Sequence, residues 1–359
     1  MGVSGAPNID QMNTTYDTSV RVTKRDTSKV ALKFGGLCFL VIILLVSGTP
    51  ALQERMKHHH VALVVFGRPG STPAQIRGLN DGLEELGYVT GKNLTIELLQ
   101  REDYDELRSS LRSLSQKAIN AIITTSGAET AVVKDITRAI PIIFMPAGDP
   151  VRSGFVNSLA SPRTNLTGLS FFGDSEDSGK QLQVFKKVVP SLRSVLVLYD
   201  RRKEESVPTA STLEAIKRVA AHLIIQLIES PVSSVAEAEH ALRRARTTVN
   251  GIFIICSPIF RTFKKIASIA LEKRLPVFGC NASQVAEERA LVTYAPDMYY
   301  IGYRAAWYVD RILRGAKPHD LPVETPMKFE LVINLNTAKE IGLTIPPEVL
   351  ILADKVINY

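Results

Sequence analysis

The sequence has few cysteines, few aromatic residues and no block of charge of one sign. Three cysteines among 359 residues exclude a small disulfide-dependent scaffold, and a hydrophobic fraction of 45% excludes a disordered chain. The net charge of +7 first suggests a nucleic-acid partner. However, the basic residues are spread along the chain and form no basic arm. We therefore expect a folded protein that binds no nucleic acid.

Motifs for catalysis, nucleotide binding and metal binding are missing as well. The sequence contains no G-x-S-x-G, no H-E-x-x-H, no C-x-x-C and no G-x-G-x-x-G after a strand. His222, His240 and His319 do not follow predicted strands, so a nucleophilic Ser or Cys would lack its base. The histidines at 58–60 read as a solvated linker rather than a metal site. We expect no enzyme, no metal and no cofactor.

The first 51 residues predict a leader rather than a folded domain. Basic residues within 24–33 precede a thirteen-residue apolar run at 34–46, which is short for a bilayer span of about 20 residues. A basic region, a short apolar core and small residues are typical of a secretory signal peptide. A retained anchor and a start at Met12 stay open. Whether the signal peptide is cleaved or retained as an anchor, the rest of the chain is expected in the periplasm. A retained anchor would tether it to the inner membrane by residues 34–48.

From residue 61 onward, short apolar runs alternate with amphipathic stretches. The predicted strands span 61–66, 94–99, 121–125, 141–145, 194–199, 222–228, 251–256 and 276–279. The predicted helices span 73–87, 103–118, 128–138, 176–188, 207–221, 233–247, 259–274 and 298–314. Apolar runs without alternation indicate strands buried on both faces, whereas the more polar 94–99 suits an edge. The pattern predicts an α/β protein with doubly wound parallel sheets.

Three extended segments interrupt this alternation, near 166–172, 290–296 and 322–333. We interpret them as hinge strands that cross between two lobes. The predicted organisation is a leader (1–51), a linker (52–60), a first lobe (61–168 with 295–322) and a second lobe (172–291 with 330–359).

The loops after the predicted strands are short, small and polar in both lobes. Backbone N–H groups at such helix starts suit an anionic group such as a carboxylate. The alternative is that these residues only stabilise the loops themselves, with Ser126 as a helix cap and Asp149 as a turn residue. Cys256 and Cys280 end consecutive predicted strands, so a disulfide is conceivable, but we expect free thiols.

Three stretches carry a family resemblance, namely 78–97 (GLNDGLEELGYVTGKNLTIE), 140–170 and the tail 317–357. With them, residues 61–357 resemble the solute-binding proteins of ABC transporters of the tryptophan/tyrosine-binding type. The resemblance implies a type I periplasmic-binding fold, a small solute and a permease in the inner membrane. It implies these ligand-binding residues: Arg68, Ser71, Ser126, Gly127, Ala128, Ala147 and Asp149 in the first lobe, Tyr199, Ser257 and Asn281 in the second, and Tyr294 in a hinge strand.

The sequence departs from this family at one informative place. Relatives commonly carry an acidic residue where this chain has Cys280-Asn281, and an acid is the natural partner of an α-ammonium group. Arginines also follow two strands, at Arg201, Arg202 and Arg261. We therefore hypothesise a more anionic or carboxylate-bearing solute, with solvated rim arginines as the alternative. An aromatic solute is what the resemblance implies.

The resulting prediction is a monomeric periplasmic solute-binding component of an ABC importer, which captures a small molecule by hinge closure. A membrane-anchored ligand-sensing receptor domain is the first alternative. An exported α/β hydrolase is a weaker one, because no nucleophile and base come together. A transcription regulator would need a helix-turn-helix before the lobes, and residues 1–60 do not resemble one.

Overall fold

The described part of the chain forms two β-sheets, each with helices on both faces. The computed structural model describes residues 57–67, 72–114, 116–171, 177–202, 206–261, 263–326 and 329–358. The predicted leader, with its signal-peptide and anchor alternatives, lies outside these ranges. Of the helices within them, none is both long enough and apolar enough to cross a membrane.

The first sheet contains five parallel strands in the order β2-β1-β3-β4-β5. They are β1 (His59–Phe66), β2 (Leu94–Arg101), β3 (Ala121–Thr124), β4 (Ile142–Ala147) and β5 (Leu166–Ser170). The more polar strand β2 lies at the edge, as its sequence predicts, and its Leu98 is half-exposed.

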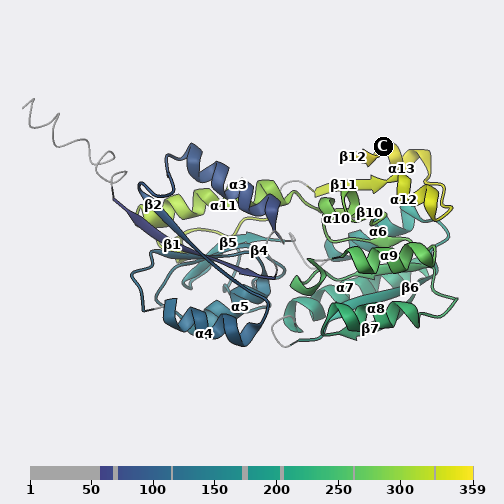
Figure 1. The fold of residues 1–359 in the computed structure, drawn as a ribbon, viewed down its shortest axis with the longest axis horizontal. Coiled ribbons are helices and arrows are strands. Elements are labelled where there is room, and N and C mark those ends of the chain that lie inside the picture. The colour runs from purple at the N-terminus through teal and green to yellow at the C-terminus, as the bar shows by residue number, and fades with distance from the viewer. Residues whose placement is uncertain are drawn as a thin grey trace, which may run out of the picture. The chain divides into compact units, whose positions relative to one another are not determined.

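Alternate side chains of β1 enter two separate hydrophobic cores. Val61, Leu63 and Val65 pack on one face of the sheet, and Ala62, Val64 and Phe66 on the other. Figure 1 shows α3 and α11 side by side over the first face, with α4 and α5 over the second. These helices are α3 (Pro73–Glu85), α4 (Tyr104–Leu114), α5 (Gly127–Ile136) and α11 (Met298–Leu313). We call this sheet, its four helices and the short η3 (Pro318–Asp320) the first lobe.

The second sheet has seven strands in the order β12-β11-β10-β9-β8-β6-β7. They are β6 (Ser194–Asp200), β7 (Gln226–Val232), β8 (Gly251–Ile254), β9 (Val277–Phe278), β10 (Val292–Pro296), β11 (Phe329–Asn334) and β12 (Lys355–Ile357). All neighbours are parallel except β10 and β11, which run antiparallel. The predicted α/β class with two mostly parallel sheets is therefore confirmed, with one antiparallel pair added.

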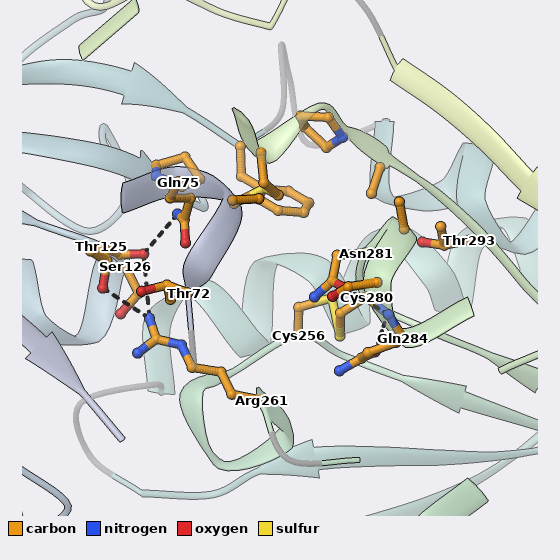
Figure 2. Close-up of a pocket in the computed structure, with 18 of the residues that line it drawn as sticks. Thr72, Gln75, Thr125, Ser126, Cys256, Arg261, Cys280, Asn281, Gln284 and Thr293 are labelled. Carbon is orange, nitrogen blue, oxygen red and sulfur yellow. Dashed lines mark hydrogen bonds between the residues drawn. A yellow bond between two sulfur atoms is a disulfide. The ribbon is translucent and has the colours of Figure 1, made fainter. Parts of the chain in front are cut away.

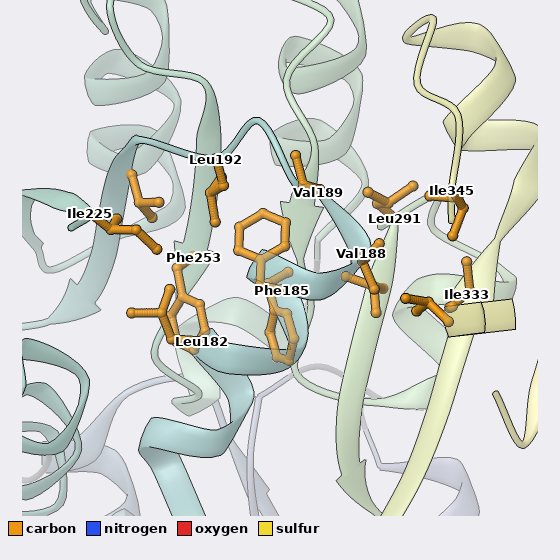
Figure 3. Packing of buried hydrophobic residues seen from close by; sticks show 14 of the residues in the cluster. Leu182, Phe185, Val188, Val189, Leu192, Ile225, Phe253, Leu291, Ile333 and Ile345 are labelled. Atoms are coloured by element: carbon orange, nitrogen blue, oxygen red, sulfur yellow. The ribbon is translucent and has the colours of Figure 1, made fainter. Parts of the chain in front are cut away.

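Helices also cover both faces of the second sheet. Figure 3 shows Phe185 of α6 among Leu182, Leu192 and Phe253, all buried. A separate core on the other face includes Leu242 of α8. The helices are α6 (Asp177–Val188), α7 (Ser206–Leu223), α8 (Val235–Arg243), η2 (Pro258–Arg261), α9 (Lys264–Glu272), α10 (Ala282–Ala286), α12 (Leu335–Glu340) and α13 (Pro347–Ile351). With these helices, the sheet forms the second lobe.

The chain passes between the lobes after β5, after β10 and before β11. The second passage is the shortest, because only Asp297 separates Pro296 of β10 from Met298 of α11. Ala295 and Pro296 pair with β11 in the second sheet. Strand β10 therefore belongs to the second lobe up to its last residue.

Three sequence predictions differ from the structure. The predicted strand 222–228 is wrong at its start, because α7 continues to Leu223 and β7 begins at Gln226. Ile224 between them has a positive φ of 54° and is 84% exposed, which ends the helix in a left-handed turn. The predicted helix 259–274 divides into η2 and α9. Strand β1 begins at His59, inside the predicted linker, because His59 and His60 pair with β2.

A buried tyrosine of the first lobe gives its stability a pH dependence. Tyr88 donates a 3.0 Å hydrogen bond to Asp310 of α11, and burial, followed by this carboxylate, raises the pKa of Tyr88 to about 12. The folded state thus favours the neutral phenol, whose ordinary pKa is 10.0. This contribution to stability is complete below about pH 10 and is lost as the pH rises towards 12.

We expect Tyr88→Phe to flatten that part of the pH profile, because the ionising group is gone. The free energy of unfolding, measured by denaturant titration at pH 9 to 11.5, should fall more steeply with pH in the wild type than in the variant. Equal slopes would show that Tyr88 does not titrate in this range. Tyr294→Phe, in the other lobe, provides the matched control.

Candidate functional site

A cavity of about 300 Å³ is lined by residues of both lobes and of the passages between them. This volume is at the lower end of the range for small-molecule sites. Figure 2 shows Thr72, Gln75, Thr125 and Ser126 from the first lobe facing Cys256, Cys280 and Asn281 from the second. Residues in and beside the passages also line the cavity, namely Phe171, Thr293, Ala295, Pro296, Asp297 and Met298.

The topology explains why these residues meet. Thr125 and Ser126 follow β3, and Pro146 and Gly148 lie at the end of β4. In the second lobe, Cys256 follows β8 and Cys280 follows β9. Parallel strands bring their carboxyl ends to one edge of a sheet, where open α/β sheets bind ligands. The cavity therefore lies where the sequence pattern predicts a site.

Two helices of the first lobe present their N-termini with uncommitted hydroxyl groups. Thr72 precedes the thirteen-residue α3 and Ser126 precedes the ten-residue α5, and neither side chain caps its helix. Thr72 is only 7% exposed. The Oγ1 atom of Thr72 and the Oγ atom of Ser126 are buried without a hydrogen-bond partner in the described structure. Hydroxyls beside the positive ends of two helices suit an anionic group.

Gln75 adds a fixed amide to the same wall. Its Nε2 atom donates to the carbonyl oxygens of Met145 (2.7 Å) and Thr125 (3.3 Å), so the amide plane is held in place. The side chain is 4% exposed and lies within the first turn of α3. Its Oε1 atom is therefore a positioned acceptor at the cavity.

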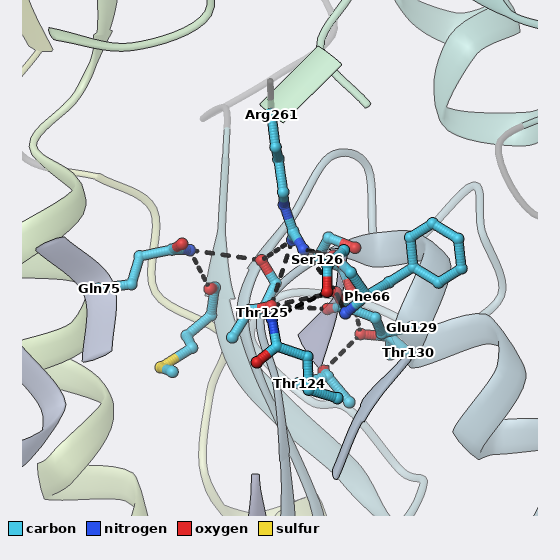
Figure 4. A network of polar contacts seen from close by, with 11 residues as sticks. Phe66, Gln75, Thr124, Thr125, Ser126, Glu129, Thr130 and Arg261 are labelled. Atoms are coloured by element: carbon cyan, nitrogen blue, oxygen red, sulfur yellow. Dashed lines mark hydrogen bonds and ion pairs between the residues drawn. The ribbon is translucent and has the colours of Figure 1, made fainter. Parts of the chain in front are cut away.

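Arg261 of the second lobe reaches into the first (Figure 4). Its Nη1 atom donates to the carbonyl oxygen of Phe66 and to Glu129 Oε1 at 3.0 Å, and its Nη2 donates to Thr125 Oγ1 at 3.2 Å. Glu129 is fully buried and also accepts from Phe66 N (2.6 Å) and Thr125 Oγ1 (2.9 Å). The charge of Arg261 is thus balanced by a buried carboxylate.

The other two arginines of the hypothesised basic rim are paired as well. Arg202 donates to the buried Asp200 at 2.6 Å, and Arg201 lies 3.2 Å from Glu237. The Arg202 guanidinium also lies over the Phe66 ring, 5.3 Å from its centroid. These three arginines therefore bring little uncompensated positive charge to the cavity, so the preference for a more anionic solute loses this support.

The predicted ligand-binding residues fall into three groups. Ser126, Gly127, Ser257 and Asn281 line the cavity. Ala128, Ala147, Asp149, Tyr199 and Tyr294 are not among its lining residues. Arg68 and Ser71 lie outside the described residues.

The residues of the second group have other contacts. Asp149 accepts from Arg152 N (3.0 Å) and from Ser211 Oγ of the other lobe (3.2 Å). Tyr294 stacks on Phe329. Tyr199 packs against the core of the second lobe that contains Phe185, where burial raises the pKa of the Tyr199 phenol. Their strand-end positions alone did not distinguish them from cavity residues.

In the second lobe, Ser257 and Asn281 are held by polar partners. Ser257 Oγ donates to Asp200 Oδ2 at 3.1 Å. Asn281 caps α10, where its Oδ1 accepts from Gln284 N at 3.1 Å. The described residues contain no group of His, Cys, Asp and Glu that could hold a metal.

The expectation of free thiols is wrong, because Cys256 and Cys280 form a disulfide with a Cα–Cα distance of 5.5 Å. Strands β8 and β9 are parallel neighbours, and Phe253 is in register with Phe278. The cysteines follow these positions by three and two residues, so they lie almost opposite one another and within bridging distance.

Several cavity residues were missed by sequence reasoning. The Thr72-Pro73 pair is a recognisable helix start and could have indicated Thr72, with Gln75 following inside the first turn. Asp297 caps α11 by accepting from Tyr299 N at 2.9 Å, and it also lines the cavity. Phe171 and Thr293 carry no local signal for a site.

Comparison with known proteins decides the family. The family model of ABC transporter substrate binding proteins matches residues 60–357, which is most of the chain. The chain belongs to this family. The resemblance read from the sequence is thereby confirmed. The substrate-binding proteins of this family bind solutes rather than catalyse reactions, in agreement with the missing nucleophile and base.

Individual relatives agree with this assignment. The substrate-binding protein is 25% identical over 271 residues to the tyrosine-binding protein of Clostridioides difficile, covering 74% of this chain and 76% of that protein. The structure of an ABC domain in complex with L-Trp from Streptococcus pneumonia matches with a TM-score of 0.77 and 22% identity, covering 84% of this chain and 100% of that one. A conserved domain protein from Vibrio cholerae matches with the same TM-score, 27% identity and the same coverage.

Proposed function

We propose that the protein is the periplasmic solute-binding component of an ABC importer and delivers a small solute to a permease in the inner membrane. Its family and its inter-lobe cavity support this role. The exported location follows from the leader pattern in residues 1–51. We further propose that it acts as a monomer, since each copy carries residues of both lobes around its own cavity.

The solute we propose is a small molecule with a carboxylate group. The observation that carries this proposal is the pair of buried, unpartnered hydroxyls, Thr72 Oγ1 and Ser126 Oγ, at two helix N-termini. Carboxylates accept hydrogen bonds from hydroxyls and first-turn N–H groups and are favoured by the helix dipole. Phe171, Phe260 and Tyr299 also line the cavity and suit an aromatic or apolar remainder. Tyrosine and tryptophan are the first solutes to test, because one relative is a tyrosine-binding protein and another is described in complex with L-Trp.

The proposed mechanism is closure of the two lobes around the solute. A solute that touches Thr72 in the first lobe and Asn281 in the second gains both contacts only when the lobes are together. It therefore binds the closed form more tightly and shifts the population towards it. No chemical step is involved.

We expect Thr72→Val and Ser126→Ala each to weaken solute binding by roughly tenfold to a hundredfold, because a hydrogen bond to a charged group contributes about 1.5–3 kcal/mol. L-Tyrosine, L-tryptophan and related carboxylates are first screened by thermal shift, and dissociation constants are then measured by calorimetry. Both variants should stay folded, since neither hydroxyl has an internal partner to lose.

Ser268→Ala provides the matched control, because this serine lies on α9 and bonds only its own helix, at Lys264 O. Unchanged affinity in both cavity variants would reject the carboxylate position. A protein that binds none of the carboxylates would reject the proposed solute class.

A further inference from the structure

The Cys256–Cys280 disulfide forms part of the wall of the solute cavity. Both cysteines are lining residues, and Figure 2 shows the sulfur bridge beside Asn281 and across the cavity from Ser126. Cys280 is 8% exposed, and Cys256 is partly buried. A solute in the cavity therefore covers the bridge.

Each cysteine directly precedes a segment that carries cavity residues. Ser257 follows Cys256 and leads into η2, which ends at Arg261 with its contacts to the first lobe. Asn281 follows Cys280 and caps α10. The bridge thus joins two loops of the second lobe that line the cavity, one of which also contacts the first lobe through Arg261.

The sheet alone holds these two loops together only weakly. Strand β9 is two residues long, and its ladder with β8 contains two registered pairs. Beyond the sheet, Gln284 also links them, since its Nε2 donates to Phe260 O at 2.7 Å and its Oε1 accepts from Cys280 N at 2.7 Å. The covalent bond thus lies where the strands have ended and the site begins.

We propose that the Cys256–Cys280 disulfide positions the second-lobe half of the solute site. It fixes the separation of the Ser257–Arg261 loop from the Asn281 loop, so that both are ordered before a solute arrives. Of the two hydrophobic cores of the lobe, one contains neither cysteine, and the other consists mostly of residues other than Cys280 and Cys256. Loss of the bridge should therefore disorder the site more than the fold. This inference rests on the proposed function for its affinity readout only.

The test uses the full chain with Cys38 replaced by Ser, so that a reductant acts on one bond. Dithiothreitol reduces the bridge to two thiols and is itself oxidised to its cyclic disulfide. We expect the reduced protein to bind L-tyrosine or L-tryptophan, whichever the oxidised protein binds, about tenfold more weakly, because the loops must be ordered on binding. We also expect a saturating solute to slow the reduction at least tenfold by covering the bridge.

Hydrogen exchange gives a readout that needs no solute. Reduction should speed the exchange of the Phe260, Cys280 and Gln284 amides, each of which bonds within its own loop segment. The β6 amides should keep their rates. Unchanged exchange at the three loop amides would overturn the positioning role, even if no solute is ever found. An equal acceleration of exchange at the three loop amides and at the β6 amides would show that the bridge has a general structural role instead.

The double variant Cys256→Ser/Cys280→Ser is the matched control. It should reproduce the exchange and affinity of the reduced protein, and dithiothreitol should change neither value further. A variant that binds its solute as tightly as the oxidised protein would also overturn the proposal. If neither amino acid binds the oxidised protein, the proposed solutes fail while the exchange result still decides the role of the bridge.

Discussion

Replacing Gly302 by alanine is expected to destabilise the first lobe by about 3 kcal/mol and to weaken solute binding as well. Helices α3 and α11 pack so closely that a Cβ atom at Gly302 would collide with the carbonyl oxygen of Gln75. Gly78 faces the backbone of Tyr299 just as closely. To make room, α3 must move, and it carries Thr72 and Gln75 to the cavity.

The sign of the change in unfolding free energy shows whether α3 and α11 pack backbone to backbone. A glycine-to-alanine change inside a helix ordinarily stabilises the helix by up to about 1 kcal/mol. Denaturant unfolding of Gly302→Ala should show the opposite sign. Glu84→Ala on the exposed face of α3 is the control and should change little. A Gly302→Ala protein as stable as the wild type would mean that the two helices are not packed backbone to backbone.

Replacing Arg261 by methionine is expected to weaken solute binding by about 3 kcal/mol, or roughly a hundredfold, because it removes one member of a buried ion pair between the lobes. Arg261 is 12% exposed at its side chain, and Glu129 is not exposed at all. Without the guanidinium, closure would leave Glu129 facing an apolar side chain, so the open arrangement is favoured. Small-angle scattering should then show a larger radius of gyration for the solute-free variant.

A second ion pair between the lobes provides the control. Arg152 and Glu214 lie 3.1 Å apart, but their side chains are 53% and 57% exposed. Exposed pairs contribute at most about 1 kcal/mol, so Arg152→Ala should weaken binding less than tenfold. Adding Glu129→Gln to Arg261→Met should recover part of the loss. Equal effects of Arg261→Met and Arg152→Ala would show that burial does not strengthen the Arg261 contact.

The fold was largely predictable because its signals are local and repeated. Unbroken apolar runs indicated parallel strands buried on both faces, and the polar 94–99 run indicated the edge position of β2. The errors occurred where a tertiary or conformational effect overrides the pattern. The mostly apolar stretch His222–Ile228 looked like one strand, but a left-handed turn at Ile224 divides it between α7 and β7.

The site was predictable only at the level of loops. The strand-end positions Ser126, Ser257 and Asn281 line the cavity, because sheet topology determines where a strand ends. Which side chain of a loop faces inward depends on its neighbours, and Asp149 instead bonds Ser211 of the other lobe. Arg261 shows the same limit, because its buried partner Glu129 is 132 residues away in the sequence. Arg202 and Asp200 are only two residues apart, but their spacing does not reveal that Asp200 is buried.

The short passage at Asp297 also bears on the kinetics of capture. In the proposed closure, residues beside this passage move least, because it joins the two lobes directly. Ala295, Pro296 and Asp297 line the cavity there and offer nearly the same surface before and after the lobes meet. Thr72 and Asn281 can act together only afterwards. Substitutions near Asp297 should therefore change the association rate, whereas substitutions on the lobes should change how long the solute stays bound.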